Sequence, residues 1–463
     1  MTDDKMPGAS VGGNVVHDLL HDAAGRSSRY LASLDRRPVA PAPQAVAALA
    51  DLGGPAPEAG MDAADVLALL DRIGGPATMA SAGPRYFGFV TGGSLPAALA
   101  ANWLAGAWDQ NSFSSVSSPV GAAFARVAVD WVVDLLGLPA GTGGALVTGA
   151  TMANFTALAA ARRAVLKTAG WDVDADGLTG APRLTVVVGA GAHATLFKAL
   201  GMLGLGRNNV TTVPVDDQGR MRADRMPDID GPTILCLQAG NVNSGAFDPA
   251  ATLIPTAKQT GAWVHVDGAF GMWAAAAPAL RSLTSGFEQA DSWAVDAHKW
   301  LNVPYDSGIA LVREPQGLAD ALSINAAYIM PGADTDPIDF SPEASQRMRG
   351  ADIWAAIKSL GRAGVADLIE RNCRQASRFA AGLEAAGIEV LNAVVLNQVL
   401  VSFGAGDATE RAIAAIQASG VCWCGGTSWH GRPAMRISVS SWATQDRDID
   451  ASLAEMIRVK ALL

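Results

Sequence analysis

Apolar, β-branched runs alternate with helix-forming stretches through the middle of the chain. Stretches rich in alanine and leucine, such as Met152–Lys167 and Ala194–Leu203, separate many of these runs. This alternation predicts an α/β fold in which a mostly parallel, doubly wound sheet is covered by helices on both faces. The runs with the length of buried strands are Leu184–Val188, Val210–Val213, Thr233–Leu237, Trp263–Val266, Ser292–Val295 and Gly308–Val312.

The two ends of the chain follow other patterns. Apolar positions recur at helical spacing in Val15–Leu31 and Met61–Ile73, but Pro/Ala/Gly-rich links join them. Such a segment has little core of its own, so we expect it to pack on another element, such as a second subunit. Beyond Arg347, a long helical region precedes short strands and a closing helix. We therefore predict three parts: an N-terminal helical dimerisation segment (1–84), a large cofactor-binding α/β domain (85–350) and a small α+β domain (351–463).

Charge and the length of apolar runs exclude several classes of protein. Lysine and arginine number 34 against 44 aspartates and glutamates, and the net charge of −10 disfavours a nucleic-acid partner. The most apolar stretches, Leu95–Trp108 and Gly268–Leu280, are shorter than the roughly 18–20 residues that span a bilayer, so we expect no membrane partner. The acidic N-terminus does not resemble a signal peptide. The four cysteines suggest neither a disulfide framework nor a zinc motif, which indicates a cytoplasmic protein.

Small residues follow the apolar run that ends at Val147. Gly149, Ala150 and Thr151 lie where an alanine-rich helix begins. Free backbone N–H groups at a helix N-terminus bind phosphate, and Thr151 adds a hydroxyl. These residues therefore form a candidate phosphate site, with an ordinary helix cap as the alternative.

Two later strand ends carry charged side chains. Asp267 ends the run in HVDGA, where a buried carboxylate needs a cationic partner, although a capping role is the alternative. In DAHKW, Lys299 follows Asp296 and His298 directly after an apolar run. Burial lowers the pKa of a lysine and suits it to Schiff-base chemistry, whereas a solvated surface lysine is the alternative.

Ligands of open α/β sheets bind beyond the carboxyl ends of the strands. His193 and Asn243 follow two further strands there. A single ligand with a phosphate, an aldehyde and a basic ring nitrogen would engage the whole set. Pyridoxal 5′-phosphate has all three: Gly149–Thr151 would hold the phosphate, Asp267 the ring nitrogen and Lys299 the aldehyde carbon.

Five motifs also occur in the order of a known family. The sequence VTGATMAN, AHATLFKA, GNVNSGAFDP, HVDGAFG and VDAHKW resembles the pyridoxal-phosphate-dependent group II amino acid decarboxylases, over about residues 85–442. The resemblance implies the aspartate-aminotransferase fold (fold type I), with a large seven-stranded sheet. It also implies decarboxylation of an L-amino acid by a homodimer whose active site lies at the subunit interface.

The resemblance assigns roles to single residues. It implies that His193 stacks on the cofactor ring, and that Phe87 and Phe89 line the substrate pocket, which would suit an aromatic amino acid. Asn243 occupies a position where relatives often have threonine. The expected catalytic residues are Lys299, His193 and Asp267, and the expected cofactor-binding residues are Gly149, Ala150, Thr151, His193, Asn243, Asp267, Ala269, Asp296, His298 and Lys299.

One region departs from the family pattern. Relatives often carry a loop tyrosine that protonates the product carbon, whereas here Pro337 and Phe340 lie near that position and Tyr328 comes too early. In some relatives, loss of the tyrosine diverts the reaction toward aldehyde formation. Because residues 328–350 are rich in Pro, Gly and Asp, we expect a mobile lid, and His193 or the other subunit would supply the proton.

Three other functions stay open on the sequence alone. An aminotransferase or aldehyde-forming enzyme would use the same cofactor. A metallohydrolase would pair His265 with Asp267 and Asp296 with His298, but it would leave Lys299 without a role, so we expect no metal. A non-catalytic binding protein is the third alternative.

Overall fold

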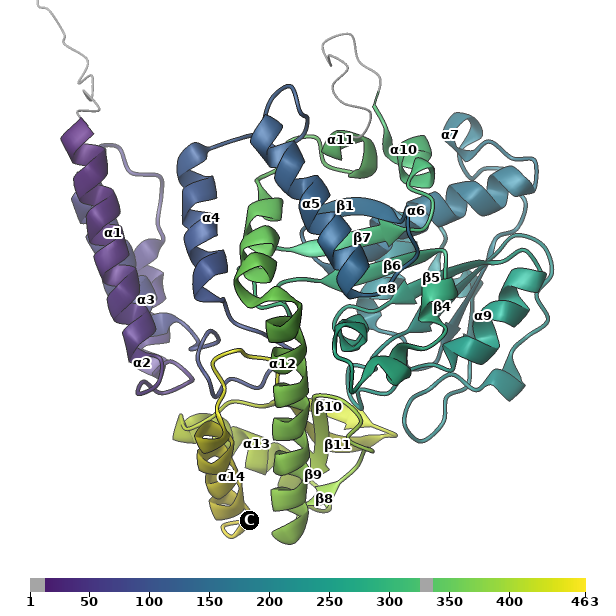
Figure 1. Ribbon diagram of the computed structural model, residues 1–463. Helices are drawn as coiled ribbons and strands as arrows, with labels where there is room; N and C mark the ends of the chain where they lie inside the picture. Colours follow the sequence, from purple (N-terminus) through teal and green to yellow (C-terminus); the bar gives the residue numbers. More distant parts are fainter. Residues whose placement is uncertain (1–12, 325–335) are drawn as a thin grey trace, which may run out of the picture.

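A seven-stranded sheet forms the centre of the protein in the computed structural model, which describes residues 13–324 and 336–463 (Figure 1). The strand order is β1-β7-β6-β5-β4-β2-β3. β7 runs antiparallel to β1 and β6, and the other neighbouring pairs are parallel. The strands are β1 (Gly143–Val147), β2 (Thr185–Gly189), β3 (Val210–Val213), β4 (Thr233–Gln238), β5 (Trp263–Asp267), β6 (Ser292–Asp296) and β7 (Gly308–Val312).

Helices cover both faces of this sheet. The helices are α1 (Gly13–Ser33), α2 (Pro43–Ala47), α3 (Ala63–Ala77), α4 (Pro96–Trp108), α5 (Pro119–Leu135), α6 (Ala150–Thr168), α7 (Val173–Asp176), α8 (Ala194–Met202), α9 (Ala250–Gln259), α10 (Gln316–Leu322), α11 (Pro337–Phe340), α12 (Arg349–Ala385), α13 (Ala408–Ser419) and α14 (Asp446–Lys460). α6 and α8 pack on one face, while α5, α9 and α12 pack on the other. Alternation along β2 divides its side chains between these two layers, since Val186 and Val188 face α6 and α8 and Val187 faces the other core. The predicted doubly wound α/β architecture is confirmed.

A second, antiparallel sheet forms the small C-terminal domain, with the order β10-β11-β9-β8. α12 joins the two domains because its first half packs in the large core and Phe379 and Leu383 pack in the small one. The helix is interrupted at Gly361, whose φ of 63° is outside the helical region. The strands are β8 (Glu389–Val390), β9 (Gln398–Ser402), β10 (Gly425–Trp429) and β11 (Arg432–Ser438).

The N-terminal helices stand apart from the sheet. Figure 1 shows α1 and α3 side by side next to α4, on the side of the molecule away from α7 and α9. Much of their apolar surface stays exposed, including Leu20 (59%) and Leu70 (59%). The division into segments 1–84, 85–350 and 351–463 stays a proposal, since α12 contributes to both cores.

Candidate functional site

Polar side chains gather where the parallel strands β4, β5 and β6 end. Asp267 lies opposite Gln238 of β4 and Ala294 of β6. Asp296 is the last residue of β6, and both aspartates are buried. The parallel arrangement brings these carboxyl ends to one edge of the sheet, as the sequence predicts.

Asp296 organises the lysine side of the site. Its Oδ2 atom lies 3.0 Å from Nζ of Lys299. Its Oδ1 atom accepts the N–H of Ala150 at 2.6 Å and lies 3.5 Å from Nε2 of His298. The side chain of Lys299 is 21% exposed, so the amine is held at the site and stays within reach of a ligand. One carboxylate therefore joins the lysine, the start of α6 and His298.

Asp267 is held by neutral donors. Asn154 of α6 donates to its Oδ2 atom at 3.4 Å, and the N–H of Ala269 donates to Oδ1 at 3.3 Å. Burial raises the pKa of Asp267, and the charges of His193 and Lys299 oppose this rise. No described residue forms an ion pair with Asp267, so its carboxylate can accept a further cationic donor.

His193 begins α8 and faces the same edge. Its Nδ1 atom accepts the N–H of Thr195 at 3.3 Å, so Nε2 carries the ring hydrogen of the neutral form. Burial lowers the pKa of His193, the charge of Asp267 opposes this, and Lys299 and Arg436 lower it further. The imidazole is therefore a neutral donor through Nε2 near neutral pH.

The start of α6 lies against His298. A side chain at Gly149 would meet the His298 ring at 3.0 Å, and the opposite Gly308 of β7 packs directly on the Gly149 backbone. Ala150 already donates its N–H to Asp296. The N–H and hydroxyl of Thr151, which is partly exposed, are therefore the donors that this helix start offers to a phosphate.

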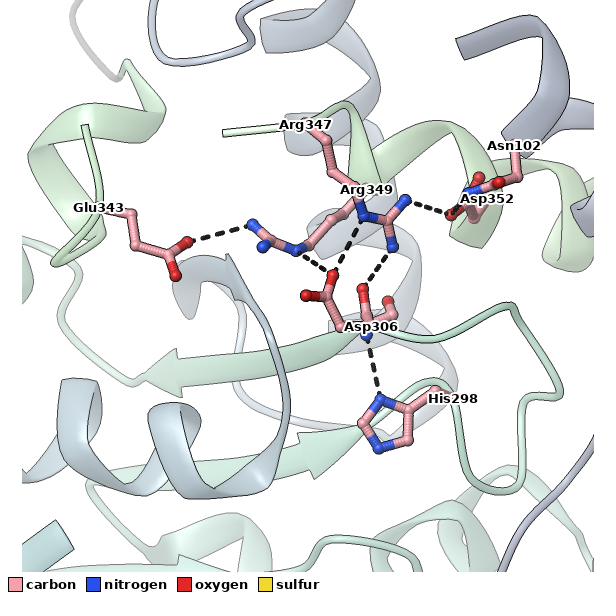
Figure 2. Close-up of polar contacts among 8 residues, drawn as sticks. Asn102, His298, Asp306, Glu343, Arg347, Arg349 and Asp352 are labelled. Atoms are coloured by element: carbon pink, nitrogen blue, oxygen red, sulfur yellow. Dashed lines mark hydrogen bonds and ion pairs between the residues drawn. The ribbon is translucent and has the colours of Figure 1, made fainter. Parts of the chain in front are cut away.

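The loop after Lys299 is held by an ion-pair network, which Figure 2 shows between His298 and the start of α12. Asp306 accepts from Nε of both Arg347 and Arg349, each at 3.1 Å. Although burial raises the pKa of Asp306, these two guanidinium groups hold it below its usual range. The next residue, Ser307, donates its N–H to Nδ1 of His298 at 3.0 Å. The network thereby fixes the imidazole with Nε2 toward Asp296.

Further ion pairs extend this network, as Figure 2 shows. Arg349 also contacts Glu343 at 3.2 Å, and Arg347 contacts the buried Asp352 at 3.0 Å. Residues 336–350 are packed: Ile338 is 5% exposed and Met348 is 2% exposed. Apolar burial and ion pairs thus hold most of residues 336–350, although Ala344 and Ser345 are exposed, and this does not favour the expected mobile lid. Tyr328 and the rest of the expected lid before residue 336 lie outside the described residues.

The two phenylalanines expected in the substrate pocket differ. Phe87 is 1% exposed and packs edge-on against Phe379 in the core of the small domain, at a ring separation of 5.2 Å. The structure thus places its side chain in the core of the small domain and does not favour the expected pocket role, which stays a prediction. Phe89 is 64% exposed and lies 5.4 Å from the ring of Trp423. Its φ of 55° is in the left-handed region, which is uncommon for a non-glycine residue and recurs at functional sites.

Trp423 and Tyr305 add aromatic surface that the sequence analysis missed. Trp423 stacks on Tyr86 at 5.0 Å and fills the space beside Gly88, where no side chain would fit. Tyr305 is 60% exposed and its ring lies 4.4 Å from that of His298. The backbone at Gly92 packs on the carbonyl of Lys299, which brings this aromatic segment to the lysine.

Asn243 and Ala269 lie at the same edge with different neighbours. Asn243 follows β4, and its side-chain oxygen accepts the hydroxyl of Thr427 from β10 at 3.0 Å. The carbonyl of Ala269 accepts the N–H of Asp296 at 2.8 Å, and its own N–H donates to Asp267. Asn243 therefore links the site to the small domain, and its contact with a cofactor stays a prediction.

Comparison with known proteins decides the family. The model of the pyridoxal-dependent decarboxylase conserved domain matches residues 56–405. The chain belongs to the pyridoxal-dependent decarboxylase family. The resemblance stated from the motifs is thereby confirmed.

Two named members and one solved structure illustrate the similarity to this family. The chain is 30% identical over 324 residues to tryptophan decarboxylase 1 of Oryza sativa subsp. japonica, covering 64% of this chain and 62% of that protein. It is 27% identical over 317 residues to a phenylacetaldehyde synthase of a Rosa hybrid cultivar, covering 64% and 61%. The crystal structure of Oryza sativa TDC with PLP and tryptamine matches with a TM-score of 0.90 and 24% identity, covering 98% and 99%. The aligned sequence thus spans less than two thirds of these two relatives, while the shared fold, of type I, extends over the whole chain.

The described residues fit the cofactor of this family. Pyridoxal phosphate carries an anion, an aldehyde and a basic ring nitrogen, and the site offers a helix start, a lysine and a buried carboxylate for them. The buried carboxylate of Asp267, held only by long amide contacts, is the observation that favours a cationic ring nitrogen.

The metallohydrolase alternative does not match the geometry of the described residues. Both ring nitrogens of His265 are engaged, by Ser292 and Asn154 at 2.8 Å each. Within residues 13–324 and 336–463, no group of three or more His, Cys, Asp or Glu side chains could hold a metal ion. The same ranges contain no helix that is long and apolar enough to cross a membrane.

Proposed function

We propose that this protein decarboxylates an L-amino acid with pyridoxal phosphate. One observation carries the proposal: at neighbouring strand ends, Lys299 is paired with Asp296 while Asp267 is buried without a described cationic partner. When bound, pyridoxal phosphate supplies an electron-accepting ring that stabilises the electron pair left on the α-carbon when carbon dioxide departs.

The protein's own residues would bind the cofactor and orient it. Lys299 would hold the cofactor through Nζ, with Asp296 keeping that nitrogen at the site. Asp267 would keep a proton on the ring nitrogen, because a buried carboxylate favours a protonated partner. His193 would donate through Nε2, and Thr151 would bind the phosphate at the start of α6.

An aromatic side chain is the proposed substrate class. Phe89, Trp423 and Tyr305 expose aromatic surface beside the lysine segment, which supports this class. Relatives named for tryptophan and for tyrosine or DOPA agree with it. A panel of amino acids tests the proposal: aromatic members should release carbon dioxide and an equal amount of amine. Carbon dioxide release from none of the panel, by protein carrying the cofactor, would overturn it.

Aldehyde formation is the second candidate. The relative named phenylacetaldehyde synthase favours it, as does the lack of a tyrosine in the described residues 336–350. Measuring amine, aldehyde and ammonia in the same tubes separates the two reactions. Amine in proportion to carbon dioxide supports decarboxylation, which is redox-neutral. Aldehyde with ammonia in that proportion supports the diverted reaction, a two-electron oxidation that must also consume an oxidant such as dioxygen and release hydrogen peroxide in equal amount.

We also propose a homodimer in the cytoplasm. Leu20, Leu70 and Leu104 leave apolar surface exposed on α1, α3 and α4, beside a cavity of about 770 Å³ between these helices. Such a surface suits a second copy of the chain. The four cysteines are free, which agrees with a reducing compartment. Sedimentation of fully active protein as a monomer would refute the dimer.

A further inference from the structure

A line of side chains, buried except for the half-buried Trp263 at its start, leads to Asp267 through the large domain. Nε1 of Trp263 donates to Oγ of Ser292 at 2.9 Å, and Oγ of Ser292 lies 2.8 Å from Nδ1 of His265. Nε2 of His265 lies 2.8 Å from Oδ1 of Asn154, whose Nδ2 atom donates to Oδ2 of Asp267 at 3.4 Å. Four hydrogen bonds thus connect an indole to the carboxylate.

The fold explains why these residues meet. His265 and Ser292 are register partners on the parallel strands β5 and β6, so their side chains lie on the same face of the sheet. Asp267 follows His265 by two residues and faces the same way. Asn154 lies on α6, one turn after Ala150, and α6 covers this face.

The direction of hydrogen donation follows from the carboxylate. An ionised carboxylate can only accept, so Asn154 turns its NH2 toward Asp267 and its carbonyl oxygen toward Nε2 of His265. The hydrogen of the neutral imidazole is then on Nε2, and Nδ1 accepts the hydroxyl hydrogen of Ser292. The indole N–H can only donate, so Oγ of Ser292 also accepts from Trp263.

Every link in the interior is neutral. Asn154, His265 and Ser292 are each 0% exposed. Burial lowers the pKa of His265 to about 3, so the ring carries no charge at neutral pH. The titratable groups that act on Asp267 come from other elements, namely His193 at the start of α8, Asp296 at the end of β6 and Lys299 after that strand.

We propose that Trp263, Ser292, His265 and Asn154 are positioning residues that orient the Asp267 carboxylate toward the ring nitrogen of bound cofactor. The inference rests on the proposed function, because it assumes that this nitrogen lies at Asp267. A chain of neutral donors fixes a carboxylate without neutralising it, so its charge stays available to the protonated ring. Outer partners of this kind typically change the performance of a site by about 10-fold to 100-fold.

Asn154→Leu tests the last link with little change in volume. Thr156→Val is the matched control, since Thr156 is equally buried on α6 and its hydroxyl has no hydrogen-bond partner among the described residues. With ¹⁵N in the ring of the cofactor, the leucine variant should lose the ring proton at least about one pH unit lower than wild type. Its kcat should fall roughly tenfold with KM little changed, and the valine control should match wild type.

Ser292→Ala and Ser292→Thr test the middle of the chain if Asn154→Leu fails to fold. The alanine variant removes the hydroxyl, and the threonine variant restores it, so ring titration should shift in the first and recover in the second. Histidine ¹⁵N spectra of the wild-type chain without cofactor should show His265 neutral, with its hydrogen on Nε2, down to about pH 5.

Two results would overturn this inference without overturning the proposed function. One is wild-type ring titration in both Asn154→Leu and Ser292→Ala, in protein that binds the cofactor and turns over. The other is a His265 ring with its hydrogen on Nδ1. Failure of the proposed function is a separate result, because wild-type protein would then release no carbon dioxide. The histidine spectrum would still report the hydrogen bonds of His265 in that case.

Discussion

Asp267 and Asp296 end neighbouring strands, and their surroundings are opposite. Asp296 receives Lys299 at 3.0 Å, His298 at 3.5 Å and the N–H of Ala150 at 2.6 Å. From the residues that the structure describes, Asp267 receives amide hydrogens alone, at 3.4 and 3.3 Å. An isolated buried charge is costly, and neutral donors offset only part of that cost. The difference teaches that Asp296 binds the protein's own cation, whereas the Asp267 carboxylate has no cationic partner among the described residues and is proposed to accept one from a ligand.

The largest effect is expected from Lys299→Ala. The change removes the amine that would hold the cofactor and leaves Asp296 without its closest cation. Turnover should fall by roughly 10⁴-fold or more, because a covalent step is lost. Borohydride treatment followed by peptide mapping measures the adduct. A reducible adduct at another lysine in the variant would contradict the assignment.

Asp267→Asn should produce the next largest effect. The amide keeps the shape of the side chain but removes the charge that holds the ring proton, so kcat should fall by roughly 10³-fold, about 4 kcal/mol, while cofactor still binds. Steady-state kinetics and cofactor absorbance measure the two quantities.

Asp248→Asn is the control for a neighbouring buried carboxylate to which no role toward the cofactor is assigned. Asp248 accepts the N–H of Met221 at 2.6 Å and that of Gln238 at 2.7 Å. Its replacement should lower the free energy of unfolding and leave kcat near wild type. A near-normal kcat in Asp267→Asn would contradict the proposed difference in role between Asp267 and Asp296.

Asp296→Asn should have a smaller effect on kcat and a larger one on cofactor retention. An asparagine offers one oxygen where Asp296 uses two, so either Ala150 or Lys299 loses its acceptor. We expect cofactor affinity to fall by roughly 10-fold to 100-fold, measured by equilibrium dialysis. An affinity equal to wild type would show that Asp296 does not organise the lysine side.

Phe87 and Phe89 provide the same comparison for one residue type in two environments. Phe87→Ala should lower the free energy of unfolding by about 3–5 kcal/mol, because it empties a core position. Phe89→Ala should change stability little and raise the KM of an aromatic substrate, since its ring is mostly exposed. Urea unfolding and substrate titration measure both, and a reversed pattern would move the pocket to Phe87.

The smallest effect is the contribution of His265 to the pH dependence of the free energy of unfolding. The pKa of His265 is about 3 in the folded chain, below the usual 6.5 of the unfolded chain. The unfolded state therefore binds more protons below pH 6.5, and stability falls as pH falls from 6.5 toward 3. Between pH 6.5 and 5 this amounts to about 2 kcal/mol.

His265→Gln should remove that contribution, measured by urea unfolding at several pH values. His17→Gln, which changes an exposed histidine on α1, is the control and should keep the wild-type pH dependence. An unchanged slope in His265→Gln would show that His265 does not stay neutral in the folded chain.

The sequence predicts those residues of the candidate site that a local pattern identifies. Asp267, Asp296 and Lys299 were found because each follows an apolar run, and parallel strands place such residues at one edge. Asn154 and Trp423 were missed, since neither follows a strand. A polar residue on the buried face of an alanine-rich helix was the signal for Asn154. β10 has no signal of its own in the sequence, because the residues Gly425–Trp429 lack an apolar run.

By itself, the sequence determined the α/β architecture, the family and the residues that end each strand, because hydrophobic periodicity and short motifs are local properties. Only the tertiary structure decided which of those residues are paired. It put Phe87 in a core and left Phe89 exposed, and it gave Asp296 a cation and Asp267 two amides. The physical reason is that burial, ion pairing and pKa depend on neighbours that are distant in sequence, such as Asn154, 113 residues from Asp267.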